Sequence, residues 1–314
     1  MKKIGYIDHY LNNFHADVYV KLIREGRFKE QFDVAYAYGE VAADGVDSEQ
    51  WCKDNSVELL GSPAEVVEKS DCVVVLSPNN PERHWDLCQE ALASGKPVYV
   101  DKTFAPDAAT AAKLVEMAVK SGTPMFTTSA LRFVPEIGEF LNGIGREHPA
   151  QAVSVRGPSS FAVYGVHVIE PLVMLLGRGA QQVTYFGDGR FMQFGVNYAD
   201  GRIGGFSLFE PGCAMGDRWC AQPFEASVIF GDGTAVYRFT ADSMFRDLAD
   251  AMCEFFSGGP SPAPDPRRTH PGVPRAGRRW THPAARHRHR QPVHHGREAR
   301  AREGAQRRPG DHAA

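Results

Sequence analysis

The stretch Val98-Tyr-Val-Asp-Lys-Thr-Phe-Ala-Pro-Asp107 decides how the rest of the sequence is interpreted. It starts with three residues of strand character, and a helical pattern over 108–120 follows it. Asp101 and Lys102 therefore stand at the carboxyl end of a predicted strand, where open α/β sheets place their ligand crevice. An ammonium group there can polarise a carbonyl, hold a hydroxyl or move a proton. The alternative is an exposed lysine at a strand end.

Strand and helix patterns alternate on both sides of this stretch. Strands are predicted near 4–7, 32–38, 71–77, 97–100 and 122–128, and helices near 16–23, 50–55, 64–68, 82–94 and 108–120. This alternation is typical of an α/β domain with a doubly wound parallel sheet of the Rossmann type. We therefore expect a dinucleotide-binding domain over residues 1–128.

The second half of the sequence has a different pattern of predicted elements, in which strands mostly follow strands. Strand patterns follow one another with hairpin signals such as Asp188-Gly189 and Asp200-Gly201, and they lie near 151–156, 181–187, 191–198, 203–210, 224–230 and 233–239. One helical stretch, 167–176, interrupts them. These features predict an α+β domain over residues 129–258 with a mostly antiparallel open sheet, available for a substrate or a partner subunit.

The first loop argues only weakly for a dinucleotide. Rossmann domains usually carry Gly-x-Gly-x-x-Gly here, so that pyrophosphate can approach a helix N-terminus. In Gly5-Tyr-Ile-Asp-His-Tyr-Leu-Asn-Asn-Phe-His15 only the first glycine matches. We assign Gly5, Ile7 and Asp8 as candidate cofactor-binding residues. Glu40, after the second strand, could accept hydrogen bonds from an adenosine ribose and favour NAD over NADP, or it could be a solvated acid.

The end of the third predicted strand supplies further candidates. Ser77, Pro78 and Asn79 would lie in the crevice beside a bound ribose or nicotinamide, and Asp101 joins them as a cofactor-binding candidate. His84 follows in the same loop, and we expect it to satisfy backbone groups at a helix end.

A second chemical candidate is the segment Gly165-Val-His-Val-Ile-Glu-Pro171. His167 and Glu170 are three residues apart and would share one face of a helix. Pro171 is predicted to lie in the first turn, which would put His167 at the helix start, projecting into a cleft. A histidine there can take or give the proton that accompanies hydride transfer, although it could instead cap the helix or pack at a domain seam.

Three segments together resemble one family. Val98-Tyr-Val-Asp-Lys-Thr103 is similar to its Glu-Lys-Pro strand end, Leu131-Arg-Phe-Val-Pro135 to its Arg-Phe-x-Pro segment, and Gly165-Val-His-Val-Ile-Glu170 to its Gly-x-His-x-x-Asp helix. Over residues 1 to about 258 the sequence resembles the glucose–fructose oxidoreductase / inositol dehydrogenase / rhizopine catabolism (Gfo/Idh/MocA) family. The resemblance implies a Rossmann domain, a second domain whose open sheet is used in oligomers, and NAD(P)-dependent oxidation or reduction of sugars and polyols.

The resemblance also implies roles for individual residues. Lys102 would bind and polarise the substrate hydroxyl, His167 would assist proton transfer, and Arg132 and Tyr164 would complete the substrate site. Val163 stands where the family often has an aspartate, and Tyr164 could supply a hydroxyl in its place. The alternative function is a non-catalytic or non-redox member that binds a sugar or a protein partner.

Composition excludes several other classes. The totals are those of a soluble globular protein, and no apolar run reaches the roughly 18 residues that span a bilayer. The N-terminus is a strand pattern and not a signal peptide. Six scattered cysteines predict reduced thiols in the cytoplasm, with no metal site. We expect a sugar or polyol substrate, NAD or NADP with NAD favoured, and a homo-oligomer through the C-terminal sheet if the C-terminus is intact.

The last segment, residues 259–314, differs from everything before it. Residues 265–314 carry 13 Arg, no Lys and four acidic residues, and they lack Leu, Ile, Met, Phe and Tyr. Such a segment cannot bury enough apolar surface to order, so we expect disorder. Nucleic-acid binding or metal chelation by its histidines is the less favoured interpretation. We prefer a frameshift near Pro266 to Thr269, which the coding DNA would test.

Overall fold

The structure is a computed structural model, and it describes residues 1–187, 191–209 and 223–262. These residues lie in one compact unit. Most of the tail predicted over 259–314 lies outside the described residues, as does the hairpin signal Asp188-Gly189.

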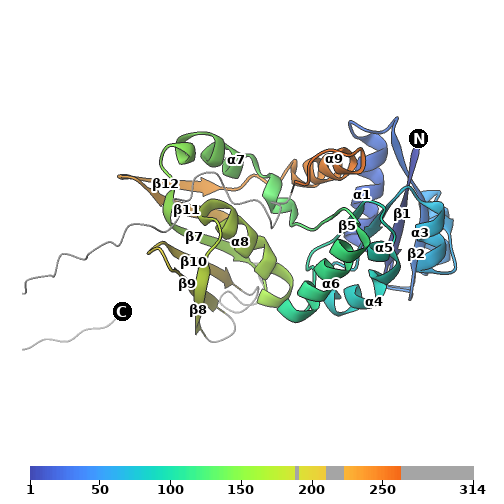
Figure 1. Ribbon diagram of the computed structural model, residues 1–314, viewed down its shortest axis with the longest axis horizontal. Coiled ribbons are helices and arrows are strands. Elements are labelled where there is room, and N and C mark those ends of the chain that lie inside the picture. Colours follow the sequence, from blue (N-terminus) through green and yellow to red (C-terminus); the bar gives the residue numbers. More distant parts are fainter. Residues whose placement is uncertain (188–190, 210–222, 263–314) are drawn as a thin grey trace, which may run out of the picture. The chain divides into compact units, whose positions relative to one another are not determined.

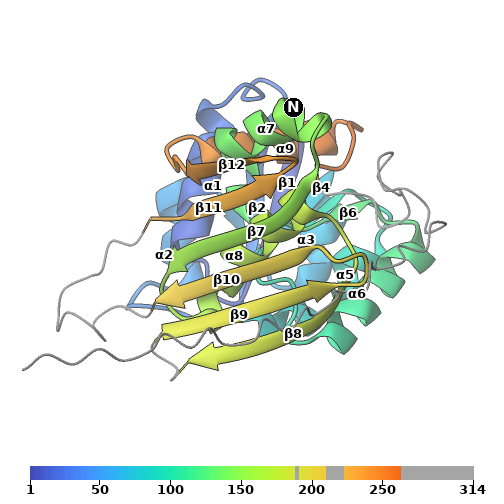
Figure 2. The same cartoon turned by 90° about the vertical axis from the view of Figure 1, so that its left-hand side faces the viewer.

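The first sheet has six strands in the order β3-β2-β1-β4-β5-β6, and all of its strand pairs are parallel. The strands are β1 (Lys2–Asp8), β2 (Phe32–Gly39), β3 (Glu58–Leu59), β4 (Cys72–Val75), β5 (Val98–Val100) and β6 (Met125–Phe126). The helices of this part of the chain are α1 (Phe14–Glu25), α2 (Ser48–Asn55), α3 (Pro63–Lys69), α4 (His84–Leu87), α5 (Gln89–Ala93) and α6 (Ala108–Ser121), labelled in Figures 1 and 2. The predicted Rossmann fold is confirmed.

Helices cover both faces of this sheet, which is why β1 and β4 have near-continuous apolar sequences. Residues of α1 and α2 share one core with Ile4 and Tyr6 of β1. Residues of α3, α4, α5 and α6 share the opposite core with Ile7. The helix predicted over 82–94 is divided at Cys88 and preceded by a 3₁₀ turn, Pro81–Arg83.

The second sheet also has six strands, in the order β12-β11-β7-β10-β9-β8 (Figure 2). One pair, β7 with β10, is parallel, and the other four are antiparallel. The strands are β7 (Ala150–Pro158), β8 (Ala180–Gly187), β9 (Phe191–Tyr198), β10 (Ile203–Phe209), β11 (Glu225–Phe230) and β12 (Gly233–Arg238). The prediction of a second, mostly antiparallel sheet is confirmed.

The long helix of this half, α8 (Phe161–Leu176), corrects a prediction. Pro171 lies inside the helix and not in its first turn, so His167 is not at the helix start. A proline inside a helix removes a backbone hydrogen bond and costs about 3 kcal/mol. Val168, Leu172 and neighbouring apolar residues are buried against the second sheet, and their burial offsets this cost.

The chain then returns to the first sheet. The helix α9 (Met244–Phe256), which the sequence analysis did not predict, packs against α1. Leu248, Met252 and Phe256 of α9 are buried in the same core as Ile4 and Tyr6. The boundary predicted near residue 128 remains a prediction, and residues after the second sheet also contribute to the first core.

Candidate functional site

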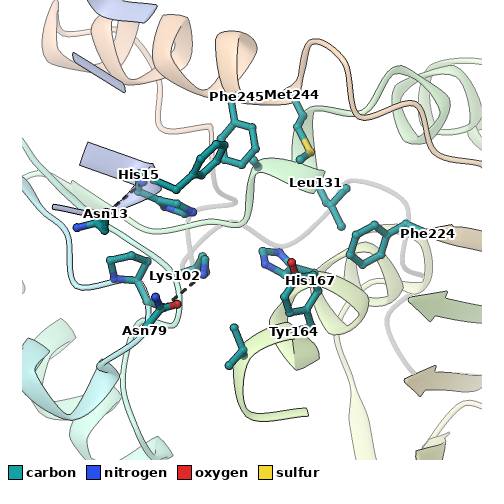
Figure 3. Close-up of a pocket in the computed structure, with 14 residues that line it drawn as sticks. Asn13, His15, Asn79, Lys102, Leu131, Tyr164, His167, Phe224, Met244 and Phe245 are labelled. Carbon is teal, nitrogen blue, oxygen red and sulfur yellow. Dashed lines mark hydrogen bonds between the residues drawn. The ribbon is translucent and has the colours of Figure 1, made fainter. Parts of the chain in front are cut away.

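A cavity of about 360 Å³ lies where the ends of the parallel strands face α8 (Figure 3). Seven parts of the chain contribute to it: the start of α1, the loop after β4, the loop after β5, the 3₁₀ turn Ala130–Phe133, α8, the residue before β11, and the first turn of α9. Its lining residues are Asn13, Phe14, His15, Pro78, Asn79, Lys102, Ala130, Leu131, Val163, Tyr164, His167, Phe224, Met244 and Phe245.

Lys102 enters the cavity from the end of β5, and only 6% of the residue is exposed. Its Nζ donates to the backbone oxygen of Pro78 over 3.3 Å. Burial lowers the pKa of Lys102, and the neighbouring Asp101 opposes that shift. A desolvated amine with one backbone partner is suited to hold the oxygen of a small substrate.

Asp101 lies behind Lys102 and is completely buried. Its carboxylate accepts from the backbone N–H of Lys102 over 2.8 Å and from the Tyr99 hydroxyl over 3.0 Å, and its other oxygen lies 2.5 Å from Nδ1 of His15. Burial alone would raise the pKa of Asp101, but His15 and Lys102 outweigh it, and the pKa lies below its ordinary value. Asp101 therefore supports the cavity from outside its lining, and its predicted role in cofactor binding remains a prediction.

His167 and Tyr164 line the opposite side of the cavity, on α8. Nδ1 of His167 lies 2.6 Å from the Ser129 hydroxyl, and the Tyr164 ring packs edge-on against the imidazole. Burial, Lys102 and His15 lower the pKa of His167 to about 3, so the ring is neutral near pH 7. The amine and the imidazole singled out in the sequence thus share one cavity.

Arg132 and Glu170 form a partly buried pair beside this site. Nη2 of Arg132 lies 2.5 Å from the Glu170 carboxylate, which also accepts from the backbone N–H of Ser129 over 2.5 Å and from the Thr128 hydroxyl. Neither charged residue is among the cavity lining. Their geometry fixes the segment that carries Ser129, and the predicted substrate contact of Arg132 remains a prediction.

The end of β1 is packed with side chains. A Cβ on Gly5 would lie 2.2 Å from the Ser70 hydroxyl oxygen, and Ile7 is completely buried. Asp8 is also completely buried and accepts from Nδ2 of Asn13 over 2.8 Å. Burial raises the pKa of Asp8 to about 8, against the opposing effect of the Asn13 hydrogen bond. None of Gly5, Ile7 and Asp8 lines the cavity.

The other cofactor candidates divide into two groups. Pro78 and Asn79 line the cavity, and Asn79 donates to the Tyr10 hydroxyl over 3.3 Å. Ser77 turns away and bonds the backbone oxygen of Asn80 over 3.1 Å. Glu40 is outside the cavity lining.

Glu40 and His84, two residues of the loops beside the predicted crevice, form hydrogen bonds or ion pairs with other residues of the chain. The Glu40 carboxylate lies 2.7 Å from Nδ1 of His9 and 2.6 Å from Nη2 of Arg83. Nδ1 of His84 lies 3.0 Å from the backbone oxygen of Phe104, and its other nitrogen faces that of Leu76. His84 thus joins the loops after β4 and β5, and its partners are carbonyls of these loops and not the groups of a helix end.

The main residue that sequence reasoning missed is His15. It stands in the first turn of α1, directly after the loop in which a dinucleotide fingerprint was sought. The sequence could have pointed to His15 through its position and not through its residue type, because the first turn of this helix faces the crevice in Rossmann domains. Phe224, Met244 and Phe245 carried no such signal, since only tertiary packing brings them to the cavity.

The described residues contain neither a candidate metal-binding group nor a candidate membrane-spanning helix. No group of three or more His, Cys, Asp or Glu side chains is placed to hold a metal ion within the described ranges. In the same residues no helix has the length and apolar character to cross a membrane.

Comparison with known proteins agrees with this architecture. Residues 15–129 match the sequence model of an oxidoreductase family with an NAD-binding Rossmann fold, Gfo/Idh/MocA. A search of curated protein sequences finds no match.

Solved structures share the fold at low identity. A dehydrogenase (MviM) from Clostridium difficile is 16% identical with a TM-score of 0.63, covering 82% of this chain and 91% of that one. The apo scyllo-inositol dehydrogenase from Lactobacillus casei is 12% identical with a TM-score of 0.66, covering 82% and 89%. Biliverdin reductase from Synechocystis sp. PCC 6803, solved with biliverdin and NADP⁺, is 14% identical with a TM-score of 0.58, covering 82% and 91%.

A nicotinamide dinucleotide fits one end of this crevice better than the other. At the start of α1, the backbone N–H groups of His15 and Ala16 already donate to Oδ1 of Asn13 over 3.0 and 3.1 Å. Beside them, a Cβ on Gly39 would lie 2.4 Å from the Ser48 hydroxyl oxygen and 3.1 Å from Leu11. The usual pyrophosphate cradle is therefore filled by side chains. The cavity beside Pro78, Asn79 and Lys102 is open and polar enough for a nicotinamide.

Proposed function

Since residues 15–129 belong to the Gfo/Idh/MocA family of oxidoreductases with an NAD-binding Rossmann fold, we propose that this protein transfers hydride between a nicotinamide cofactor and a sugar or polyol. The observation that carries the proposal is that Lys102, from the parallel sheet, and His167, from the helix of the second sheet, line one cavity. Polar groups that converge on a cavity from two parts of a chain are the usual signature of a small-molecule site.

Each polar residue of the cavity has a role in this proposal. Lys102 holds the reacting oxygen of the substrate, because its amine is desolvated and has a backbone partner on one side only. The neutral His167 lies across from it and accepts or donates a hydrogen bond at the same oxygen. Tyr164 stacks with Phe224 at 6.2 Å, and such aromatic faces suit the C–H faces of a sugar ring.

A bound nicotinamide would supply the hydride acceptor or donor, and Pro78 and Asn79 would hold it beside Lys102. We propose NAD as the cofactor in preference to NADP, on the strength of the acidic residue Glu40 after β2. The fold likeness to a scyllo-inositol dehydrogenase supports the choice of a polyol as substrate class.

We also propose a cytoplasmic homo-oligomer. The support is the outer face of the second sheet, where Phe186, Ile203, Ile229 and Val236 are 47–65% exposed. Apolar side chains that stand together on an open sheet favour association with another copy. Light scattering of the purified chain tests this directly, and a monomer at all concentrations would contradict it.

The test of the proposed activity uses the full chain. NADH and NADPH are titrated by fluorescence, and then scyllo-inositol, myo-inositol and aldoses are offered with the oxidised cofactors while reduced nicotinamide is followed by absorbance. Lys102→Ala is expected to lower kcat/KM by about 10²–10⁴-fold without loss of cofactor binding. Lys113→Ala, on the exposed side of α6 against Trp85, is the matched control and keeps full activity. Equal activity of the wild type and Lys102→Ala would refute the assigned role.

A second candidate function is sugar binding without redox chemistry. The filled pyrophosphate cradle, with Asn13 on the helix N–H groups, is the observation that favours it. In that case sugars or polyols would bind to the wild type and neither NADH nor NADPH would.

A further inference from the structure

A second histidine faces the cavity from the side opposite His167. His15 is 8% exposed, lines the cavity beside Lys102, and stands against the rings of Phe14, Tyr19 and Phe245 at 5.4–5.9 Å. Figure 3 shows its imidazole and the Lys102 amine on one wall and His167 across from them. These aromatic contacts leave the ring little freedom to turn.

The buried carboxylate of Asp101 fixes which nitrogen of His15 carries the proton. Nδ1 lies 2.5 Å from Oδ2 of Asp101, and a carboxylate accepts hydrogen bonds and does not donate them. Nδ1 therefore carries the hydrogen, and the lone pair of a neutral ring stands on Nε2. Within the described part of the chain Nε2 has no hydrogen-bond partner, so it is the nitrogen available to a molecule in the cavity.

Neither of the other two basic groups is as well placed to take a proton. Lys102 already has the proposed role of the cation that holds the substrate oxygen. His167 has the Ser129 hydroxyl as its Nδ1 partner, and Glu170, the acid nearest to it on α8, is bound to Arg132. Val163 lines the cavity and offers no carboxylate. Of the two histidines, His15 alone has a carboxylate within hydrogen-bond distance in the described part of the chain, at 2.5 Å.

We propose that His15 is the catalytic base of this site and that Asp101 is its positioning residue, in a hydride transfer that rests on the proposed function. In the direction of oxidation, the substrate O–H bond breaks and its proton passes to Nε2 of His15. The C–H bond breaks with its electron pair, which a bound oxidised nicotinamide would accept as hydride, and the carbon–oxygen bond becomes a C=O bond. Asp101 stabilises the resulting imidazolium, and Lys102 holds the developing negative charge on oxygen.

The first test needs no substrate and no cofactor. In the full chain with ¹⁵N-labelled histidine, long-range ¹H–¹⁵N spectra report the tautomer of each ring, and His15→Gln assigns the resonances. We expect His15 as the Nδ1–H tautomer, and a shift toward the Nε2–H tautomer in Asp101→Asn. A wild-type His15 that carries its proton on Nε2 would overturn the proposal.

The second test uses the substrate that the wild type oxidises. His15→Gln is expected to lower kcat by about 10²–10⁴-fold with little change in KM, and added imidazole is expected to restore part of the rate. His148→Gln, an exposed histidine before β7, is the matched control and is expected to be fully active. If His15→Gln is unstable, His15→Asn takes its place, and the tautomer test remains decisive.

The outcomes separate this inference from the activity on which it rests. A wild type that is active and a His15→Gln variant of equal activity would refute the role of His15 and leave the oxidoreductase standing. Loss of rate without rescue by imidazole, with the Nε2–H tautomer in the wild type, would reduce His15 to a packing residue. A wild type that oxidises no alcohol of the panel removes both proposals together.

Discussion

Two completely buried aspartates stand at the ends of strands in the same parallel sheet, and they differ in charge. Asp8 is the last residue of β1, its hydrogen-bond partners are neutral groups of Asn13 and the backbone, and burial raises its pKa to about 8. Asp101 follows β5 and is equally buried, but His15 and Lys102 hold its pKa below the ordinary value. Burial is the same at both places, and the partners decide which acid is ionised.

This difference divides the crevice into two regions. The β1 end is a closed, neutral loop in which Asn13 caps α1 and leaves little room for a diphosphate. The β5 end presents the Lys102 amine and the His15 imidazole to a cavity. The chemistry that we propose is therefore assigned to the β5 end, and the β1 end is the part that differs most from a dinucleotide cradle.

The largest effect is expected for Asp101→Asn. The substitution removes a buried anion that has His15, Tyr99 and the backbone of Lys102 as partners, and such losses cost about 3–5 kcal/mol. Urea unfolding at pH 7 measures it. Asp33→Asn, which breaks the half-exposed pair with Arg24, is the control and is expected to cost less than about 1 kcal/mol. Similar costs for both variants would show that the Asp101 cluster is not a charged network.

Asp8→Asn is expected to have a mild effect near pH 4, where the carboxyl is protonated, and to change the pH dependence of stability above it. The folded chain keeps the Asp8 proton up to about pH 8, whereas the unfolded chain loses it near 3.8. The free energy of unfolding that Asp8 contributes is therefore fully present below about pH 4, and it falls by up to about 1.4 kcal/mol per pH unit until pH 8. Unfolding measured from pH 4 to 8 should show a smaller decline in the variant. Parallel curves would mean that Asp8 is ionised in the folded state.

Asp101 gives the opposite sign in the same measurement. Its folded pKa is lowered, so its contribution is present above the unfolded value of 3.8 and is lost as the pH falls through the folded pKa. The wild type should thus lose stability relative to Asp101→Asn only in acid, below about pH 4.

Gly5→Ala tests how tightly the β1 end is packed. The added Cβ would lie 2.2 Å from the Ser70 oxygen and 2.4 Å from Val66, so we expect a loss of about 1–3 kcal/mol in unfolding free energy. Gly138→Ala in the helix Pro135–Asn142 has open space around its Cβ and is expected to stabilise by about 0.5–1 kcal/mol. A neutral Gly5→Ala would show that this glycine is kept for some reason other than packing.

The smallest effect concerns cofactor preference at Glu40. Arg83 neutralises this carboxylate, so Arg83→Gln should free it to repel the 2′-phosphate of NADPH. We expect the affinity ratio of NADH to NADPH to rise about fivefold, which corresponds to about 1 kcal/mol for a partly exposed pair. Lys69→Gln, in an exposed pair with Glu58, is the control. An unchanged ratio would place the adenosine ribose away from Glu40.

The architecture could be predicted because its signals are local. The continuous apolar run at β4, with strand and helix patterns alternating on both sides of it, indicates a parallel sheet covered on both faces. The hairpin rhythm after residue 150 indicates the second sheet. Helix α9 was not predicted, although its apolar spacing is a local signal. The position of Pro171 was predicted wrongly, because the burial of α8 outweighs the rule against a proline inside a helix.

The sequence by itself determined the two sheets and the position of Lys102 at a strand end, because period and turn chemistry act between near neighbours. It also determined the match of residues 15–129 to an oxidoreductase family model. Only the tertiary structure decided that His15 meets Asp101 across 86 positions and that α8 brings His167 to the same cavity. Contacts between residues so far apart depend on how helices pack on the sheet, and no periodicity in the chain encodes them.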